Sequence, residues 1–182
     1  MSTTILLARH GETEWNRERR VQGHSDIPLN DTGRAQAREL AKQLERERLD
    51  AVYTSDLSRA RETAEIATAG RALPTQELID LRERHFGTWE GLTDTVIRDR
   101  FPESRSGPWG DGETVEEMSA RVVAALRTIA EEHRGASVLV MTHGGPMRAA
   151  LRAAGAEPSG GIDNCHVLRI EVTVNGDLGW LD

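Results

Sequence analysis

Long stretches of this chain alternate between apolar runs and segments with apolar residues at helical spacing. Three apolar runs without polar alternation predict parallel strands covered on both faces, at residues 4–8, 51–54 and 137–142. Segments whose apolar residues recur every three or four positions predict amphipathic helices, at residues 31–47, 57–69 and 115–133. This alternation predicts an α/β fold, a three-layer α/β/α sandwich with a mostly parallel central sheet and helices on both faces.

The expected helices have recognisable ends and buried faces. Thr114 and Glu117 form a capping box that begins the helix of residues 115–133. Three apolar stripes are expected to face the sheet: Ala37, Leu40, Ala41 and Leu44; Ala60, Ala64 and Ala67; and Val115, Met118, Val122, Leu126 and Ile129. Residues 166–173 alternate more and predict a strand nearer a sheet edge, whereas residues 91–112 are irregular, with one short helix at residues 94–100.

Composition narrows the class of protein only a little. The 182 residues fit a single domain with a sizeable core, and their formal charge of -7 argues weakly against a nucleic-acid partner. Cys165 is the only cysteine, which excludes an intrachain disulfide framework. Neither a membrane span of about 20 apolar residues nor a signal peptide is evident, so we expect a cytoplasmic protein without membrane partners.

Chemically active side chains follow each of the three predicted parallel strands. The motifs are Arg9-His10-Gly11 after the first strand, Ser55-Asp56 with Arg59 after the second, and Thr142-His143-Gly144-Gly145 after the third. Because the carboxyl ends of parallel strands share one edge of a sheet, where open α/β folds bind ligands, these motifs should converge. Two histidines, two arginines and helix N-termini in one place suit a phosphate group.

An acidic residue is expected beside this edge. The segment "LRERHFGTWEG" at residues 81–91 offers Glu83, His85 and Glu90. Glu83 directly follows an apolar piece of chain and can project into the crevice. An ion pair at the surface with Arg82 or Arg84 is an equally good interpretation of the spacing alone.

Six motifs together identify a family. "ARHGETEWN", "SDLSRARETA", "LRERHFGTWEG", "GETVEEM", "THGG" and "NCHV" occur in an order that resembles the phosphoglycerate-mutase-like branch of the histidine phosphatase superfamily. The match covers about residues 5–168. The resemblance implies one histidine-phosphatase-like domain over residues 1–182, with a short cap segment at about 91–112 above the carboxyl ends of the strands.

The resemblance also implies a role for each matching residue. His10 would be the nucleophile that becomes a phosphohistidine, and Glu83 would donate a proton to the leaving oxygen. Five groups would hold the phosphoryl group: Arg9, Arg59, a protonated His143, Asn16 and the backbone of Gly144. The substrate would be bordered by Gln22, Gly23, Trp89 and the segment from Gly91 to Gly112. To attack, His10 needs a free lone pair on one nitrogen, so its other nitrogen should donate to a backbone carbonyl.

These roles favour a metal-independent phosphatase without a cofactor that acts on a small-molecule phosphomonoester. The insert after the Glu83 region and the tail after Thr173 are shorter than a mutase of this family needs, so water should reach the phosphohistidine. Mutase activity stays an alternative, since Arg98, Arg100 and Arg105 of the cap can bind a substrate carboxylate. A non-catalytic phosphate-binding module is the alternative from another class. Asn164 matches the last family motif while His166 departs from it, and a homodimer is compatible with the sequence.

Overall fold

In the computed structural model, which describes residues 1–102, 110–157 and 160–181, six strands form one mixed sheet. They are β1 (Thr3–Arg9), β2 (Ala51–Thr54), β3 (Thr75–Glu77), β4 (Ser137–Thr142), β5 (Val167–Val172) and β6 (Leu178–Leu181). Their order across the sheet is β3-β2-β4-β1-β5-β6. Neighbours are parallel from β3 to β1, whereas β5 is antiparallel to both β1 and β6.

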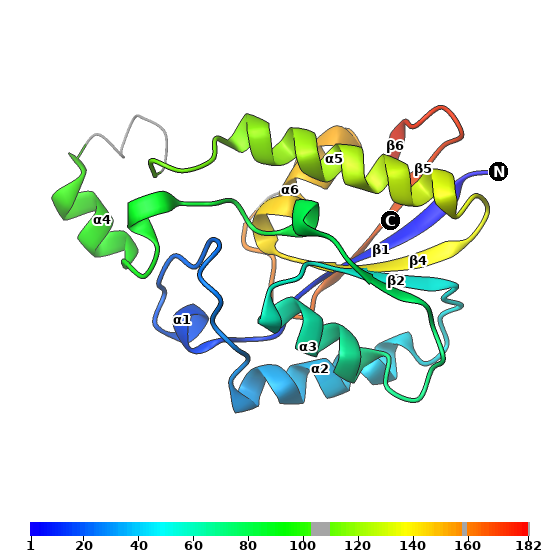
Figure 1. The fold of residues 1–182 in the computed structure, drawn as a ribbon, viewed down its shortest axis with the longest axis horizontal. Coiled ribbons are helices and arrows are strands. Elements are labelled where there is room, and N and C mark those ends of the chain that lie inside the picture. The colour runs from blue at the N-terminus through cyan, green and yellow to red at the C-terminus, as the bar shows by residue number, and fades with distance from the viewer. Residues whose placement is uncertain (103–109, 158–159, 182) are drawn as a thin grey trace.

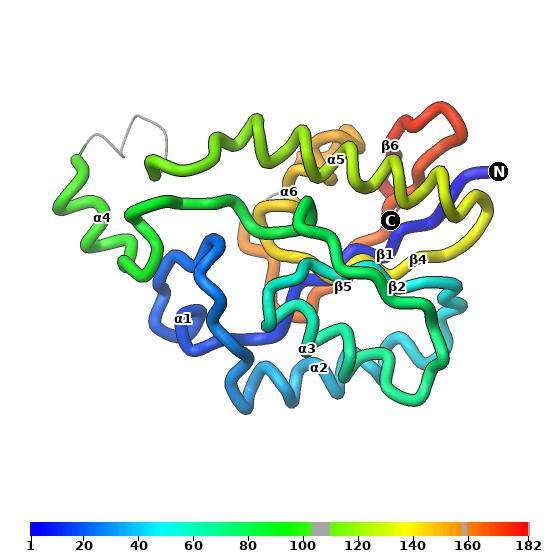
Figure 2. Tube along the Cα trace, viewed as in Figure 1, coloured from blue at the N-terminus to red at the C-terminus, as the bar shows by residue number. Residues whose placement is uncertain are grey.

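The three parallel strands predicted from apolar runs lie side by side in the middle of this sheet. In the register, Arg9 of β1 is level with Thr142 of β4, and Thr54 of β2 is level with Met141 of β4. The strands therefore end together, and the chain leaves all three at the same edge of the sheet. Figure 2 shows that this edge faces α1 and α4, whereas the N-terminus lies at the opposite end.

Helices cover both faces of the sheet, as expected for a three-layer sandwich (Figure 1). They are α1 (Glu14–Arg17), α2 (Asp31–Leu44), α3 (Ser58–Ala67), α4 (Asp94–Arg100), α5 (Val115–Glu132) and α6 (Gly144–Ala153), with short 3₁₀ turns η1 (Ile79–Leu81) and η2 (Gly87–Trp89). α5 and α6 lie on one face, and α2 and α3 lie on the other. The capping box at Thr114 and the short helix α4 are both present where the sequence predicts them.

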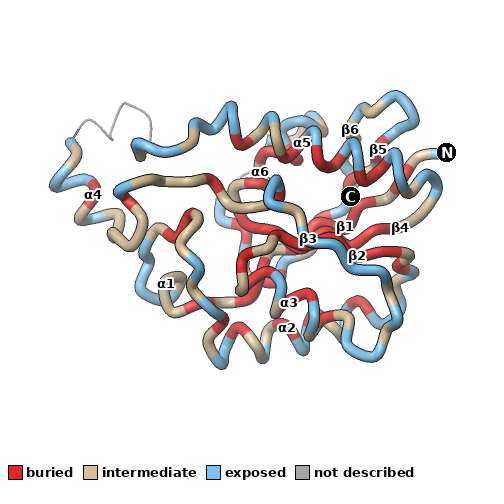
Figure 3. The backbone as a smooth tube through the Cα atoms, in the orientation of Figure 1, coloured by how far each residue is buried: buried red, intermediate tan, exposed pale blue. Residues whose placement is uncertain are grey.

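Burial on both faces explains the apolar character of the central strands (Figure 3). Along β1, Ile5 and Leu7 pack with α5 and α6, while Leu6 and Ala8 pack with α2 and α3. All four side chains are at most 1% exposed. A strand whose two faces are both buried gains hydrophobic free energy from every residue, so its sequence shows no polar alternation.

Two expectations about the elements are wrong in detail, and one strand was not expected. α2 ends at Leu44 rather than near Glu47, because Arg71 donates hydrogen bonds to the carbonyls of both residues and satisfies the end of the helix. Val115 was expected in the core, but it is 40% exposed in the first turn of α5, which extends toward the site. The edge strand β6 was not predicted, since it is short and only partly buried.

We predict that Gly33→Ala destabilises the protein, although alanine is the better helix former. Gly33 lies in α2, and a Cβ there would be 2.1 Å from the carbonyl oxygen of Glu12, in the loop after His10. Relieving this backbone clash should cost about 1–3 kcal/mol, more than the roughly 1 kcal/mol that helix propensity offers. The free energy of unfolding in denaturant measures the change, with Thr32→Ala at the exposed neighbouring position as control. A Gly33→Ala protein at least as stable as the parent would contradict the prediction.

Candidate active site

His10 lies at the carboxyl end of β1 and is held in one orientation. Its backbone N–H donates to the carbonyl of Thr142, and its ring Nδ1 lies 2.7 Å from the carbonyl oxygen of Gly11. A carbonyl can only accept, so Nδ1 carries the hydrogen and Nε2 keeps its lone pair. This is the tautomer expected of a nucleophile, with one ring nitrogen donating to the backbone.

His143 is the second imidazole, at the N-cap position of α6. Its ring centroid lies 5.0 Å from that of His10. The side chain is fully buried, and neither ring nitrogen has a hydrogen-bond partner within the described residues. Burial, and then the nearby Arg59 guanidinium, hold the pKa of both histidines well below its ordinary value. His143 is therefore neutral in the free site, and the charge expected of it requires a bound anion.

Arg59, in the first turn of α3, is a fully buried cation. Its Nη1 donates to the carbonyl of Ser25 and its Nη2 to that of Gly23, at 2.9 and 2.8 Å. Burial lowers the pKa of Arg59 to about 10, and the negative charge of Glu83 opposes that change. Two carbonyl dipoles and a carboxylate thus keep the guanidinium charged beside the histidines.

Arg9 completes the positive side of the site from the end of β1. Its Nη1 donates to the carbonyl of Ile162, which ties β1 to the loop before β5. Burial lowers the pKa of Arg9 and the carboxylate of Glu83 raises it. The Nε atoms of Arg9 and Arg59 are both buried without a hydrogen-bond partner in the described part of the chain. Unsatisfied buried donors of this kind are costly unless a ligand accepts from them.

Glu83 projects into the crevice rather than pairing at the surface. Arg82, one of its two alternative partners, forms an ion pair with Asp56 instead. The Glu83 carboxylate accepts from the backbone N–H of Arg84 at 2.9 Å and from that of Gly145 at 3.1 Å. The carboxyl group is thus held against the N-terminus of α6.

Gly145 contacts the Glu83 carboxyl group, which the residue spacing did not predict. A Cβ at this residue would lie 2.1 Å from Oε1 of Glu83, so a larger residue would displace the carboxyl group. At Gly144, by contrast, the nearest atoms to a Cβ would be 3.6 Å away or more. The double glycine of "THGG" was the available signal, but only the fold shows that the second glycine faces the acid.

Two amide side chains border a cavity of about 180 Å³ next to His10. The oxygen of Asn16 accepts from the backbone N–H of Thr13, and the oxygen of Gln22 accepts from the Thr13 hydroxyl. With their oxygens held, both side chains have amide hydrogens left to donate to an oxyanion. The cavity is lined by Arg9, His10, Asn16, Arg20, Val21, Gln22, Gly23, Arg59, Glu83 and Phe86.

A larger cavity of about 660 Å³ adjoins the first and shares Glu83 and Phe86 with it. Its remaining lining comes from three places: Arg84; residues 110–116 with Met118 at the start of α5; and Gly145, Arg148 and Arg152 of α6. Glu83 therefore lies where the two cavities meet. This position suits an acid that acts on the bond between a group in one cavity and a group in the other.

Other predicted site residues have different surroundings. Asn164 donates to the carbonyl of His10 at 2.9 Å and so supports the β1 loop, whereas His166 is exposed. The ring of Trp89 is buried against Phe101 and lines neither cavity. Among the cap arginines, Arg98 pairs with Asp94 inside α4, Arg100 lines neither cavity, and Arg105 lies outside the described residues.

Metal-ligating clusters and membrane-spanning helices are both missing from the described residues. No group of three or more histidine, cysteine or acidic side chains in them could hold a metal ion. Within the same residues, no helix has the length and apolarity that crossing a membrane requires.

Comparison with known proteins links this geometry to one family. Residues 5–177 match the model of the histidine phosphatase superfamily (branch 1). Phosphoglycerate mutase-like protein 4 of Arabidopsis thaliana is 40% identical over 163 residues, which cover 82% of this chain and 70% of the relative. A metal-independent phosphoserine phosphatase of the same plant is 39% identical, with 91% and 74% covered. The solved structure of Bacillus stearothermophilus YhfR has a TM-score of 0.89 at 37% identity, with 98% and 95% covered.

We predict that the two buried histidines make the protein less stable in acid. Their pKa values are lowered by folding, so the unfolded chain binds more protons than the folded one as pH falls below about 6.5. The free energy of unfolding should then fall by up to about 1.4 kcal/mol per pH unit for each histidine. In His143→Gln, the free energy of unfolding should fall less steeply as pH is lowered from 7, by up to about 1.4 kcal/mol per pH unit. His166→Gln, which removes a histidine outside the site, is the control. An unchanged slope in His143→Gln would show that this ring is protonated in the free protein.

Proposed function

Since this chain belongs to the histidine phosphatase superfamily, branch 1, we propose that His10 is its nucleophile and that Glu83 is its proton donor. The protein is a phosphoric monoester hydrolase of the metal-independent, phosphohistidine type. The observation that carries the assignment is the tautomer of His10, whose Nε2 lone pair is free in a pocket that the buried Arg59 and the half-buried Arg9 also line.

In the first step, Nε2 of His10 attacks the phosphorus atom and the bond to the ester oxygen breaks. Phosphoryl transfer needs in-line positioning and stabilisation of charge on the equatorial oxygens. We assign these oxygens to Arg9, Arg59 and the amide groups of Asn16 and Gln22. Because the donors are held before the substrate arrives, each can contribute a few kcal/mol to the transition state.

His143 joins this set when the phosphoryl group is bound. A dianion beside the ring favours its charged form and opposes the effect of burial on the pKa. Protonation then makes both ring nitrogens N–H donors. Neither nitrogen has a hydrogen-bond partner within the described residues, so both can donate to the ligand. The backbone of Gly144, at the start of α6, is the remaining donor that we assign to this end of the pocket.

Glu83 acts on the departing group and then on water. In its protonated form the carboxyl group gives its proton to the ester oxygen as the alcohol leaves. The resulting carboxylate takes a proton from water, whose oxygen attacks phosphorus and releases His10 and inorganic phosphate. The same carboxyl group is thereby reprotonated, so the cycle closes without a metal or cofactor.

We infer that the leaving group occupies the larger cavity and bears a carboxylate. The lining of this cavity includes Glu83, the cations Arg148 and Arg152 of α6, and the apolar side chains of Val115 and Met118. Val115 is partly exposed where it lines this cavity, so a substrate can contact it. The relative that acts on phosphoserine, a carboxylate-bearing ester, supports this substrate class.

We predict that His10→Ala abolishes turnover. The variant removes the proposed nucleophile, so activity in the presence of a chelator should fall by at least about 10³-fold. The parent should yield an acid-labile, base-stable phosphoenzyme after rapid quenching, and His10→Ala should yield none. His166→Ala is the control. Activity of His10→Ala within tenfold of the parent would remove His10 from this role.

We predict that Arg152→Gln lowers kcat/KM more for an ester with a negatively charged leaving group than for one with a neutral leaving group. The test pair is an aryl phosphate with a para-carboxylate and the same ester with a para-carboxamide, which differ mainly in charge. Arg152 is exposed, and an ion pair at an exposed site contributes up to about 1 kcal/mol, so kcat/KM for the ester with the para-carboxylate should fall about two- to fivefold. The carboxamide ester should change less than the carboxylate ester in the same variant. Equal changes in kcat/KM for the two esters would show that Arg152 does not bind the carboxylate of the leaving group.

A further inference from the structure

Glu83 lies on a stretch of chain that has no regular secondary structure of its own. Residues 82–86 connect η1 to η2, so neither a helix nor a strand fixes the backbone that carries the acid. A loop with free carbonyl groups would leave the carboxyl group poorly aligned, and a misplacement of about 1 Å can cost 10²-fold in rate. Something outside the loop must therefore hold it.

Arg121 of α5 supplies the missing hydrogen bonds. Its Nη1 donates to the carbonyls of Asp80 and Arg82 at 2.7 and 2.8 Å, and its Nη2 donates to the carbonyl of Glu83 at 2.9 Å. Its Nε and Nη2 also donate to the two carboxylate oxygens of Glu113, at 2.6 and 2.8 Å. A guanidinium group has five N–H donors, and here all five are used.

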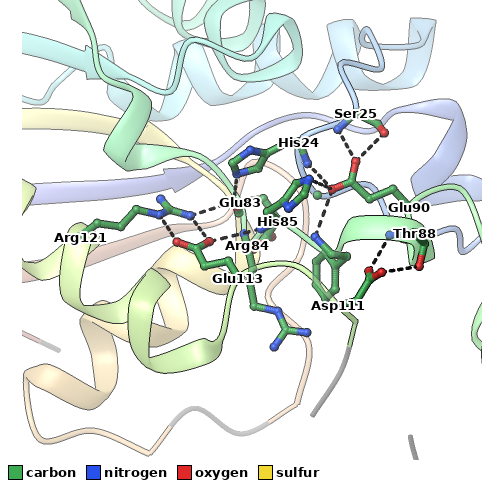
Figure 4. A network of polar contacts seen from close by, with 12 residues as sticks. His24, Ser25, Glu83, Arg84, His85, Thr88, Glu90, Asp111, Glu113 and Arg121 are labelled. Carbon is green, nitrogen blue, oxygen red and sulfur yellow. Dashed lines mark hydrogen bonds and ion pairs between the residues drawn. The ribbon is translucent and has the colours of Figure 1, made fainter.

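Glu113 holds the guanidinium in place and joins it to the same loop (Figure 4). The two side chains are only 18% and 16% exposed, so the pair is sheltered from water. Burial opposes a charge on Glu113, yet the hydrogen bond and charge of Arg121 keep the pKa of the carboxyl group below its ordinary value. Glu113 also accepts from the backbone N–H of His85, and its own N–H donates to the carbonyl of His85.

His24 holds the Glu83 carbonyl from the other side. Its Nε2 lies 2.9 Å from that oxygen, which therefore accepts from both His24 and Arg121. The loop of His24 is fixed in turn by Glu90, whose carboxylate accepts from the backbone N–H groups of His24, Ser25 and Phe86. Figure 4 shows these groups gathered around the backbone of Glu83.

We propose that Arg121, oriented by Glu113, is a positioning residue that sets the place of the Glu83 carboxyl group. The inference rests on the proposed role of Glu83 as the acid. Arg121 lines neither cavity, and it is joined to the acid through the backbone of residues 80–83 and to the larger cavity through Glu113. With those carbonyls held, the carboxyl group meets the N–H of Gly145 and points to the junction of the two cavities.

The test compares Arg121→Met with Arg127→Met. Arg127 lies on the same helix, and its side chain donates to the carbonyl of Gly176, between β5 and β6. For an alkyl phosphate, whose leaving oxygen needs a proton, kcat should fall about tenfold to hundredfold in Arg121→Met. For an aryl phosphate with an acidic phenol, the pre-steady-state burst rate should stay within about twofold of the parent, because general acid help matters little. Glu83→Gln should show the same contrast more strongly.

Two further measurements separate positioning from general damage. In the Glu83→Gln background, Arg121→Met should cause no further loss on the alkyl ester, since the two changes remove one function. Exchange of the Gly145 amide, measured by NMR, should accelerate in Arg121→Met but not in Arg127→Met. Glu113→Gln, a milder change, should accelerate the exchange in the same direction and covers the case in which Arg121→Met does not fold; exchange is the readout there, because Glu113 also lines the larger cavity.

The outcomes are distinct. Equal losses on both esters, additive losses with Glu83→Gln, or an unchanged Gly145 exchange rate would each overturn the role of Arg121. If the parent hydrolyses neither ester, the proposed function fails, while the exchange measurement still decides whether Arg121 positions the carboxyl group. If Glu83→Gln affects both esters equally while Arg121→Met accelerates exchange, Glu83 is positioned by Arg121 but is not the acid.

Discussion

The site depends on buried cationic groups that outnumber the acidic groups around them. Two guanidinium groups and two imidazoles lie at one edge of the sheet, and Arg59, His10 and His143 are almost fully enclosed. Taking cations out of water is costly, and they also repel one another. The histidines respond by staying neutral, and the pKa of Arg59 falls to about 10. The missing negative charge is that of a phosphoryl group.

The hydrophobic burial of the sheet offsets the free-energy cost of holding these charges close together. β1, β2 and β4 are buried on both faces, and their hydrophobic burial stabilises a scaffold rigid enough to hold the groups at their ends. Backbone carbonyls take up part of the charge: Gly23 and Ser25 accept from Arg59, and Ile162 accepts from Arg9. The strand ends therefore determine where the cations lie, and carbonyl groups of nearby loops accept hydrogen bonds from them.

The acid is supported by a separate part of the molecule. Glu83 lies on a loop held by Arg121, Glu113 and His24, none of which lines the cavity beside His10. Arg148 and Arg152, which face the larger cavity, come from α6. The groups that hold the phosphoryl group, place the acid and meet the leaving group are thus different residues, although α5 carries both Arg121 and Val115 and α6 carries both Gly144 and Arg148. Substitutions in one set can alter substrate choice or proton transfer while the others stay in place.

Local sequence patterns determined the central strands, the capping box, α4 and the convergence of Arg9, Arg59 and His143 on His10. Such features follow from burial on two faces, from hydrogen bonds between near neighbours and from the rule that parallel strands end at one edge. Tertiary structure alone decided that Gly145 meets Glu83, that Arg121 holds the acid loop, that Val115 leaves the core and that Trp89 is buried against Phe101. Each of these features depends on contacts between residues that are far apart in the sequence. Such contacts form only in the folded chain, so the local spacing of residues cannot predict them.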